Sequence, residues 1–327
     1  MVLILSRSDL EKILTMKDVI ESVERAFLEL QKGTAILPMR ATITLTEKRG
    51  WMGVMPAYLG EMGSLSTKIV TVFEKNLEKN LPTIMATILL NDPETGAPLA
   101  IMEGTFITAM RTGAVCGVAT KYLARKDSKT VGIFGAGVQA RTQLMAACAV
   151  RDIEKAFVYD IFKDRAKTFA EEMSKKLGIL VEVSEPKDLV LHSDIIVTAT
   201  TSKTPVFDGN WVKPGTHLNL IGSFKPEVRE VDEIVIKRSK IVVDQKSAAL
   251  EEAGDIIIPL KAGIITEKDI YAELGEIVAG LKPGRTSERE ITLFKSVGLG
   301  IQDCATAWLA YTRAKESGIC KEIDLFS

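Results

Sequence analysis

The stretch Val131-Gly132-Ile133-Phe134-Gly135-Ala136-Gly137-Val138-Gln139-Ala140 decides the fold of this chain. Its apolar first half predicts a buried strand, which runs through a Gly-x-Gly-x-x-Ala turn into an amphipathic helix. Gly135 permits the tight turn, Gly137 lets backbone amides approach a pyrophosphate, and Ala140 lets the helix pack closely on the strand. The N–H groups at a helix N-terminus favour phosphate. The stretch therefore predicts a dinucleotide-binding turn, with candidate cofactor contacts at Gly135, Gly137, Val138, Gln139 and Ala140.

An acidic residue closes the next predicted strand. Asp160 follows the apolar run after Ala156, at the place where a carboxylate can accept hydrogen bonds from a ribose hydroxyl. The same carboxylate would repel a 2'-phosphate. The sequence therefore favours NAD(H), while Lys163 and Arg165 nearby leave NADP(H) possible.

Strand and helix patterns alternate after Lys129, which is typical of a doubly wound parallel sheet. Strands are predicted at 130–134, 156–160, 180–183, 194–198, 217–221 and 241–244. A last helix, from about Gly300 to Glu316, lies beyond this region and is expected to pack on the N-terminal half.

The N-terminal half follows another pattern. Apolar residues recur with a period of two, and this periodicity predicts strands at 41–46, 51–56, 65–73, 83–90 and 98–102. No crossover helix separates these runs, so they predict an antiparallel meander. A helix is expected from about Thr105 to Arg125.

Composition excludes several classes of protein. A chain of 327 residues is long enough for two cores. With 42 basic and 43 acidic residues it lacks the basic surface of a nucleic-acid binder. The apolar run at the N-terminus is too short for a signal peptide or a membrane span, so a cytoplasmic protein is expected. Four dispersed cysteines and two histidines predict no metal site.

Several motifs in a fixed order resemble the ornithine cyclodeaminase and mu-crystallin family, which includes archaeal alanine dehydrogenases and ketimine reductases. The resemblance covers essentially the whole chain. Its carriers are Met55–Leu59, Lys68 in Ser-Thr-Lys-Ile-Val, Leu81–Thr83, Asn91–Leu99, Met110–Ala114, Gly135–Ala140, Gly222–Glu230 and Gly298–Asp303.

The resemblance implies an α/β fold in which a Rossmann doubly wound parallel sheet is joined to a discontinuous α+β domain with an antiparallel meander. Residues 1–117 with 299–327 are expected to form the substrate-binding and dimerisation domain, and residues 118–298 the dinucleotide-binding domain. A homodimer that acts on a small carboxylate substrate, with no nucleic-acid or membrane partner, is expected.

The resemblance also implies roles for individual residues. Arg40 and Arg111 are expected to grip the substrate carboxylate, because a planar guanidinium can make two parallel bonds to it. Lys68 is expected at the same site, and Thr83 as a substrate hydrogen-bonding residue or an ordinary strand position. Thr112 is expected to touch the cofactor phosphate. Two further candidate cofactor contacts are Thr200 and Gly222.

Lys68 stands among apolar and hydroxyl neighbours, so poor solvation should lower its pKa and fit it to shuttle a proton. Asp303 has two interpretations: it could orient Lys68, as a third catalytic residue beside Lys68 and Arg111, or it could cap the last helix, which is the preferred interpretation.

One position departs from the ornithine cyclodeaminases, which carry an acidic residue shortly after the glycine of the sixth-strand loop. Here that position is Phe224, and a phenyl ring cannot move protons. The sequence therefore favours an NAD(P)H-dependent reductase of 2-imino acids, such as a ketimine or pyrroline-2-carboxylate reductase. Alanine dehydrogenase is the nearest alternative. Ornithine cyclodeaminase is disfavoured, and a non-catalytic, mu-crystallin-like ligand-binding protein stays open.

Overall fold

The computed structural model describes residues 1–325, and the chain divides into two compact units. Unit 1 comprises Met1–Thr112 together with the segment that begins at Leu299. Unit 2 comprises Gly113–Gly298. The chain passes between the units twice: first within one continuous helix, α3 (Gly104–Leu123), and then at Gly298–Leu299, just before the helix that begins at Gly300.

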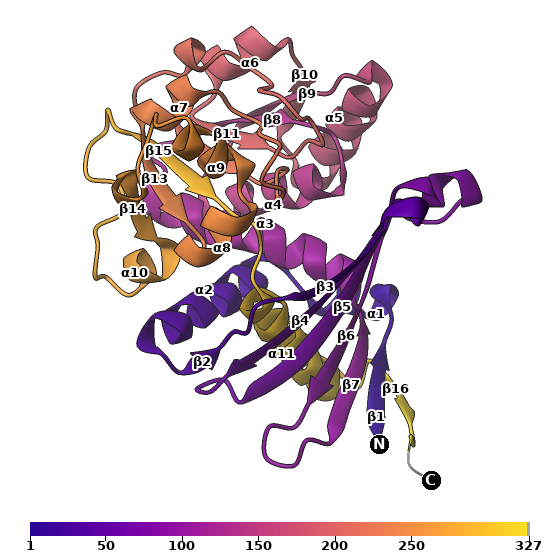
Figure 1. The fold of residues 1–327 in the computed structure, drawn as a ribbon. Coiled ribbons are helices and arrows are strands. Elements are labelled where there is room, and N and C mark those ends of the chain that lie inside the picture. The colour runs from indigo at the N-terminus through magenta and orange to yellow at the C-terminus, as the bar shows by residue number, and fades with distance from the viewer. Residues whose placement is uncertain (326–327) are drawn as a thin grey trace. The chain divides into compact units, whose positions relative to one another are not determined.

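Unit 1 is built on a sheet in the strand order β16-β1-β7-β6-β5-β4-β2, with β3 beside β4 (Figure 1). The meander predicted from the sequence is present, since β3 to β7 pair antiparallel along the chain. Beyond it, β1 pairs parallel with β7, and β16 pairs antiparallel with β1. The elements besides α3 are β1 (Val2–Leu5), α1 (Arg7–Ile13), α2 (Met16–Lys32), β2 (Ala35–Ile36), β3 (Ala41–Leu45), η1 (Thr46–Lys48), β4 (Gly50–Leu59), β5 (Ser64–Phe73), η2 (Glu74–Lys79), β6 (Ile84–Asn91), β7 (Pro98–Glu103), α11 (Gly300–Ser317) and β16 (Lys321–Ile323).

One face of the unit 1 sheet is covered by α11, which also packs on α2 (Figure 1). Alternation along β5 decides which side chains meet that helix, because successive strand residues point to opposite faces. Ser66, Lys68 and Val70 are buried beneath it, whereas Ile69 is exposed on the opposite face. The core of unit 1 therefore contains a lysine in the middle of a strand.

Unit 2 is a doubly wound sheet in which all strands run parallel, in the order β10-β9-β8-β11-β12-β15-β13-β14. Its elements are β8 (Thr130–Phe134), α4 (Val138–Val150), β9 (Lys155–Tyr159), α5 (Lys163–Leu177), β10 (Leu180–Val183), α6 (Pro186–His192), β11 (Ile195–Thr198), η3 (Gly209–Trp211), β12 (His217–Leu220), α7 (Glu233–Arg238), β13 (Ser239–Val243), α8 (Lys246–Glu252), α9 (Gly254–Lys261), η4 (Glu267–Asp269), β14 (Ile270–Glu273), α10 (Leu274–Val278) and β15 (Ile291–Lys295).

The central strands of unit 2 are apolar on both faces, as strands buried between two helical layers must be. In β11, Ile195 and Val197 pack in one core with helices α4 and α5, while Ile196 packs in the other core with α7 and α9. The two cores hold the carboxyl ends of β8, β11 and β12 side by side. Ligands of such sheets bind at this edge.

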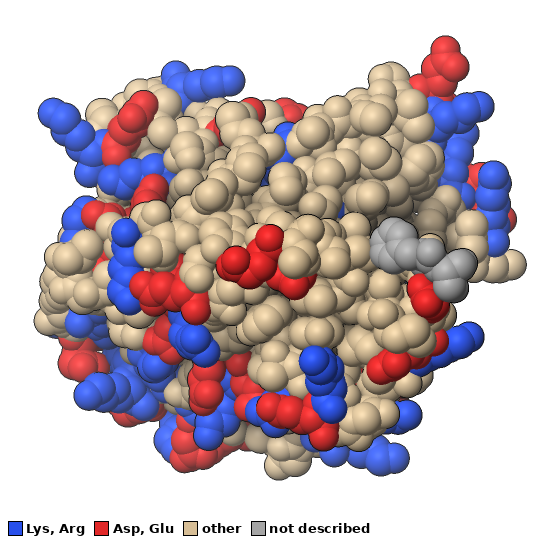
Figure 2. All heavy atoms as spheres, turned by 90° about the horizontal axis from the view of Figure 1, so that it is seen from below, with Lys and Arg blue, Asp and Glu red and all other residues tan. Residues whose placement is uncertain are grey.

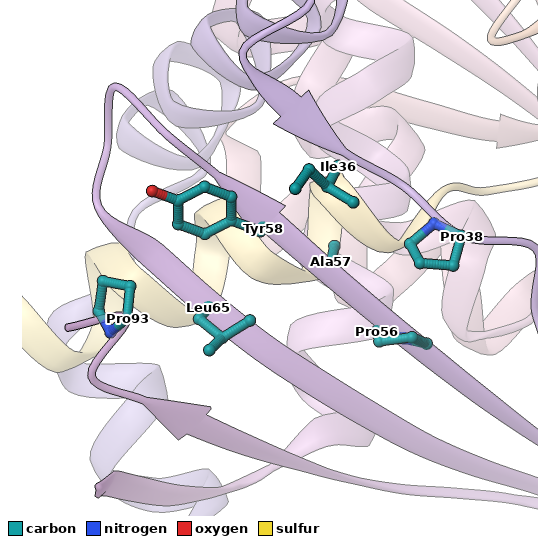
Figure 3. Close-up of a pocket in the computed structure, with 7 residues that line it drawn as sticks. All are labelled: Ile36, Pro38, Pro56, Ala57, Tyr58, Leu65 and Pro93. Atoms are coloured by element: carbon teal, nitrogen blue, oxygen red, sulfur yellow. The ribbon is translucent and has the colours of Figure 1, made fainter. Parts of the chain in front are cut away.

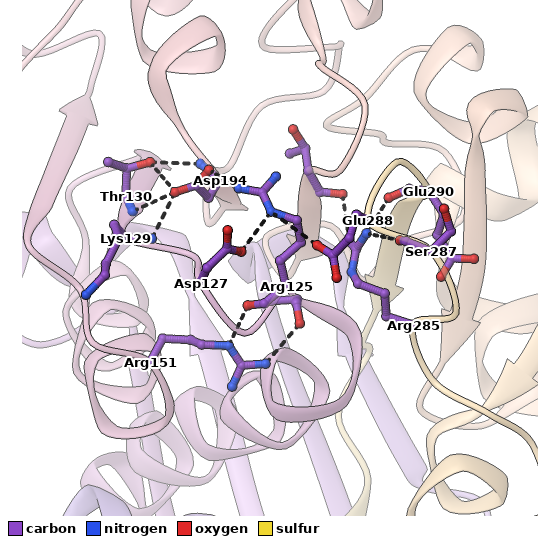
Figure 4. A network of polar contacts seen from close by, with 12 residues as sticks. Arg125, Asp127, Lys129, Thr130, Arg151, Asp194, Arg285, Ser287, Glu288 and Glu290 are labelled. Carbon is purple, nitrogen blue, oxygen red and sulfur yellow. Dashed lines mark hydrogen bonds and ion pairs between the residues drawn. The ribbon is translucent and has the colours of Figure 1, made fainter.

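A polar network secures the opposite, amino-terminal edge of the same sheet (Figure 4). Asp194, just before β11, accepts hydrogen bonds from Arg125, from the Lys129 and Thr130 backbone amides and from the Thr130 hydroxyl. Arg151 donates to the Thr120 and Lys121 carbonyl groups in the last turn of α3 and to the Ala124 carbonyl just beyond it. These contacts fix the C-terminal end of α3 within unit 2.

The face of the molecule shown in Figure 2 carries acidic and basic side chains interspersed, without a continuous surface of either sign. Among residues 1–325, no helix is long and apolar enough to cross a membrane. The same residues contain no group of three or more His, Cys, Asp or Glu side chains that could hold a metal ion.

Candidate active site

A buried cluster of charged side chains lies between the sheet and helices of unit 1. The Nζ atom of Lys68 on β5 lies 2.5 Å from Oδ2 of Asp303 on α11. The other oxygen of Asp303 accepts a hydrogen bond of 3.1 Å from Nε of Arg111 on α3. One carboxylate is therefore shared by two cations, and all three side chains are at most 8% exposed.

This arrangement corrects the preferred interpretation of Asp303 as a helix cap. The N-cap of α11 is Leu299, and no side chain bonds the N-terminal amides there. Asp303 lies in the first turn of the helix but faces the sheet, where it bonds Lys68 and Arg111. The competing interpretation, that Asp303 orients Lys68, agrees with the geometry.

Burial changes the proton affinity of this cluster. The pKa of Lys68 is lowered to about 7, chiefly because burial disfavours the ammonium form, and because the positive charges of Arg111 and Arg40 repel it; Asp303 opposes this shift. Burial alone would raise the pKa of Asp303, but Arg111 and Lys68 lower it. Lys68 can therefore gain and lose a proton near neutral pH, while Asp303 stays ionised.

Gln302 is a member of the cluster that the sequence did not reveal. Its Oε1 atom accepts a 2.8 Å hydrogen bond from Nη1 of Arg111, so Gln302 and Asp303 fix two of the three guanidinium nitrogens. Its Nε2 atom is buried and has no hydrogen-bond partner among the described residues. The sequence feature that could have pointed to Gln302 is the polar pair at 302–303 in an otherwise apolar helix turn.

The other two residues expected to bind substrate, Arg40 and Thr83, lie at different distances from Lys68. Arg40 precedes β3, and its charge acts on Lys68. Thr83 precedes β6, where its carbonyl accepts from the Phe73 amide, whereas Lys68 pairs with Ile88 farther along that strand. At about 3.4 Å per residue, Thr83 lies roughly 17 Å along the sheet from Lys68. The structure thus brings together Lys68, Arg111 and Asp303, near Arg40, but not Thr83.

The glycine turn of unit 2 has the form expected of a phosphate cradle. Gly135 has φ of +94°, and an added Cβ would lie 2.6 Å from the Ala199 carbonyl oxygen, so only glycine fits this turn. Gly137, the N-cap of α4, has open space around it, and no side chain bonds the first amides of that helix. Val138 is 64% exposed, and Ala140 is buried against the sheet. The turn fits a dinucleotide pyrophosphate.

Asp160 follows β9 and supports this turn directly. Its carboxylate accepts 2.8 and 2.9 Å hydrogen bonds from the amides of Ala136 and Phe162. The acid that would recognise a ribose therefore also fixes the glycine turn. Thr112, the remaining residue expected to touch the cofactor phosphate, donates its hydroxyl to the Thr108 carbonyl.

The predicted cofactor contacts Thr200 and Gly222 follow strands β11 and β12. Their backbone amides donate to the carboxylate of Glu230, so contacts of these residues with a ligand must use other atoms. In the sequence, nothing distinguishes Glu230 beyond its place at the end of the motif Gly222–Glu230. In the same loop as Gly222, Phe224 is 42% exposed.

A dinucleotide turn on a parallel sheet and a buried lysine–carboxylate–arginine cluster on a mixed sheet define a two-unit protein of the nucleotide-binding oxidoreductase type. The model of the ornithine cyclodeaminase/mu-crystallin family matches residues 2–318. The chain belongs to this family, as the motifs in its sequence indicated.

Relatives of the chain match over nearly their whole length. This chain is 39% identical over 324 residues to a Δ1-pyrroline-2-carboxylate reductase of Bacillus cereus, and the match covers 98% of this chain and 99% of the relative. The structure of the Thermococcus litoralis Δ1-pyrroline-2-carboxylate reductase, in complex with NADH and L-proline, superposes with a TM-score of 0.96 at 57% identity, covering 98% and 100%. An archaeal alanine dehydrogenase dimer with bound NAD superposes with a TM-score of 0.94 at 39% identity, covering 99% of each chain.

Proposed function

We propose that this protein is an NADH-dependent reductase of small 2-imino acids, with Δ1-pyrroline-2-carboxylate as the first candidate substrate. Unit 1 would bind the substrate and unit 2 the cofactor. The observation that carries the proposal is the buried contact of Lys68 with Asp303 and Arg111, found in a chain whose other unit bears a complete dinucleotide turn.

The charge cluster supports an anionic substrate. Lys68 and Arg111 share a single carboxylate, so the cluster carries more positive than negative charge whenever Lys68 is protonated. A substrate carboxylate would compensate this charge, and the guanidinium of Arg111 is already oriented by Gln302 and Asp303. The unpartnered Nε2 of Gln302 offers a further donor to the same anion.

Lys68 would act as the proton donor in imine reduction. Reduction of an imine adds a hydride to carbon and a proton to nitrogen, and the nicotinamide ring supplies the hydride when the cofactor is bound. With a pKa of about 7, the Lys68 ammonium group can give up a proton at neutral pH. Asp303 would keep Lys68 oriented and would stabilise the charged form before transfer.

The cofactor side favours NADH over NADPH. The open glycine turn would hold the pyrophosphate, and the carboxylate of Asp160 would accept bonds from the ribose hydroxyls while repelling a 2'-phosphate. The similar structures whose complexes contain NADH or NAD support this choice.

Alanine dehydrogenase is the second candidate, because an enzyme of that activity is similar over the whole chain. It would use the same carboxylate-binding cluster and cofactor turn with pyruvate and ammonia. Ornithine cyclodeaminase is disfavoured because Phe224 cannot act as a base, and a non-catalytic ligand-binding role has little use for a titrating Lys68.

Steady-state assays of the purified chain separate these candidates. NADH oxidation is measured with Δ1-pyrroline-2-carboxylate and with pyruvate plus ammonia. Ammonia release is measured with ornithine and NAD, because cyclodeamination re-oxidises the cofactor within each turnover and leaves no net NADH. We expect the highest kcat/KM with the cyclic imine and no turnover of ornithine. Higher efficiency with pyruvate plus ammonia would favour alanine dehydrogenase. NADH binding without turnover of any substrate would favour the non-catalytic role.

We also propose that the chain forms a homodimer through the face of the unit 1 sheet opposite α11. In strand register, the outward side chains of that face are largely apolar. Its exposed large apolar residues are Ile43, Leu45, Ile69, Met85 and Leu89. A pocket of about 320 Å³, drawn in Figure 3, is lined by Ile36, Pro38, Pro56, Ala57, Tyr58, Leu65 and Pro93. Contiguous apolar surface of this kind marks a protein interface.

Light scattering during gel filtration tests the dimer. The unmodified chain should elute with the mass of two copies, and the double substitution Ile43→Lys with Leu89→Lys should produce monomers, because it buries charges in the interface. Leu180→Lys, an exposed apolar residue on β10 of unit 2, is the matched control and should remain dimeric. A dimer that survives the double substitution would exclude this face.

A further inference from the structure

The carboxylate of Glu230 ties together the ends of two neighbouring strands in unit 2. It accepts hydrogen bonds from the Thr198 hydroxyl at 2.8 Å and from the Thr200 amide and hydroxyl at 2.7 Å each. It accepts another, of 2.7 Å, from the Gly222 amide. Thr198 ends β11 and Gly222 follows β12, so one buried side chain holds both loops.

A second carboxylate and a lysine extend this cluster to a third strand. Asp255, at the start of α9, accepts from the Glu230 and Val231 amides at 2.7 and 3.2 Å. It also pairs with Lys295 at the end of β15, at 2.8 Å, and Lys295 donates to the Ser223 carbonyl at 2.6 Å. Glu230, Asp255 and Lys295 are fully buried.

The backbone is packed tightly around these side chains. A Cβ atom at Gly222 would lie 2.2 Å from the Thr200 carbonyl oxygen and 2.5 Å from the Glu230 carboxylate. A Cβ atom at Gly254 would lie 1.9 Å from the Val228 carbonyl oxygen. Since neither position accepts a side chain without displacing backbone, the loops have one shape around the cluster.

The cluster depends on the charge of the Glu230 carboxylate and on its ability to accept hydrogen bonds. Burial and the nearby Asp255 raise the pKa of Glu230, while Lys295 and the hydrogen bonds from Thr200 lower it. Each oxygen of the Glu230 carboxylate accepts from a backbone N–H group, which cannot act as an acceptor, so an amide NH₂ in place of either oxygen would face a donor.

The cluster lies where the sheet would receive the nicotinamide half of a dinucleotide. The glycine turn follows β8, and β11 and β12 come next in the sheet. Because ligands bind at the carboxyl ends of such strands, a pyrophosphate at the turn directs the rest of the cofactor over the loops after β11 and β12. These are the two loops that Glu230 joins.

We propose that Glu230, supported by Asp255 and Lys295, is a positioning residue that shapes the nicotinamide end of the cofactor site. This inference rests on the proposed function, since it requires that unit 2 binds NADH. It predicts that Glu230 affects binding of the nicotinamide half and not of the adenosine diphosphate half.

Binding of NADH and of ADP, which lacks the nicotinamide half, tests the inference by titration of purified chains. In Glu230→Gln, which keeps the size of the side chain, we expect NADH affinity to fall about tenfold or more, as for loss of hydrogen bonds to a charged group. ADP affinity should stay within about twofold, because the glycine turn is untouched. Equal losses for both ligands, or no loss of NADH affinity, would overturn the inference.

Asp194, at the other end of β11 from Thr198, provides a matched control. Asp194 also accepts four hydrogen bonds, but at the amino end of β11, opposite to the carboxyl edge where ligands bind. Asp194→Asn should lower the melting temperature without changing the ratio of NADH to ADP affinity. If the ratio changes as in Glu230→Gln, the effect is a general loss of order in unit 2, and the inference fails.

A milder variant covers the case in which Glu230→Gln does not fold. Thr198→Val removes one hydroxyl donor to Glu230 and keeps the shape of the side chain, at a buried strand position that is not a candidate cofactor contact. It should weaken NADH selectively, by about two- to fivefold. Failure of the unmodified chain to bind NADH would contradict the proposed function. Normal NADH binding with an unaltered affinity ratio in Thr198→Val would contradict only the role of Glu230.

Discussion

Lys68 and Asp303 stand 235 residues apart in the sequence, yet their charged groups lie 2.5 Å from each other and both side chains are about 1% exposed. Such a pair contributes little net stability, because desolvation offsets much of the attraction between the charges. The pair matters for the protonation of Lys68 rather than for stability. It keeps a lysine in a dry site with a pKa of about 7, where both protonation states are populated near neutral pH.

This lowered pKa predicts opposite pH dependences for the two directions of reaction. Imine reduction needs the Lys68 ammonium group, which predominates below about pH 7, so kcat/KM for reduction should fall as pH rises through that value. Oxidation of the amino acid needs the neutral amine and should become faster over the same interval. Initial rates in both directions, from about pH 5 to about pH 9, check this; limbs of the same sign would refute the role of Lys68.

Replacing Asp303 by Asn should move that midpoint to lower pH. The carboxylate opposes the effect of burial on the Lys68 pKa, so its removal leaves the ammonium form less stable. Stability should fall by roughly 3 kcal/mol, because Arg111, unlike Lys68, cannot lose its charge when the carboxylate is removed. The pH profile and urea unfolding measure the two effects.

Glu29→Gln is the control for Asp303→Asn. Glu29 is a buried carboxylate of α2 that accepts hydrogen bonds from the Glu61 and Met62 amides, so its replacement should also destabilise unit 1. The midpoint of the pH profile should stay in place. A similar shift in both variants would mean that the midpoint follows the stability of unit 1 rather than the protonation of Lys68.

Removal of Asp160 should change the preference between cofactors. Asp160→Ala eliminates the charge that repels a 2'-phosphate, so the ratio of kcat/KM with NADPH to that with NADH should rise by about tenfold. Absolute rates should fall with both cofactors, because the Ala136 and Phe162 amides lose their acceptor. The exposed Asp188 of α6 gives the control, Asp188→Ala, in which the ratio should not move. An unaltered ratio in Asp160→Ala would exclude Asp160 as the selective residue.

Much of the fold was predictable because local patterns carry it. β8 and β10 have the expected bounds, and α11 ends one residue later than expected, at Ser317. β15 was not predicted, although it lies inside the sheet between β12 and β13, because its pairing partners are far away in the sequence. The parallel pairing of β1 with β7 was missed for the same reason.

The candidate site was predictable to a similar degree. Motif resemblance identified Lys68, Arg111 and Asp303, but only the packing of α11 on β5 decided between orienting Lys68 and capping the helix. Gln302 and Glu230 stand within motifs of the resemblance, but their roles depend on hydrogen bonds to Arg111 and Thr198, which are distant in the sequence, so the motifs alone do not assign those roles.

The most direct test of the account is the effect of Lys68→Ala on two separate steps. NADH affinity, measured by titration, should remain nearly intact, because the cofactor turn belongs to unit 2. Hydride transfer to Δ1-pyrroline-2-carboxylate, measured in a single turnover, should slow by about 10²–10⁴-fold, as expected for the loss of a general acid. Turnover at the rate of the unmodified enzyme would contradict the proposed mechanism.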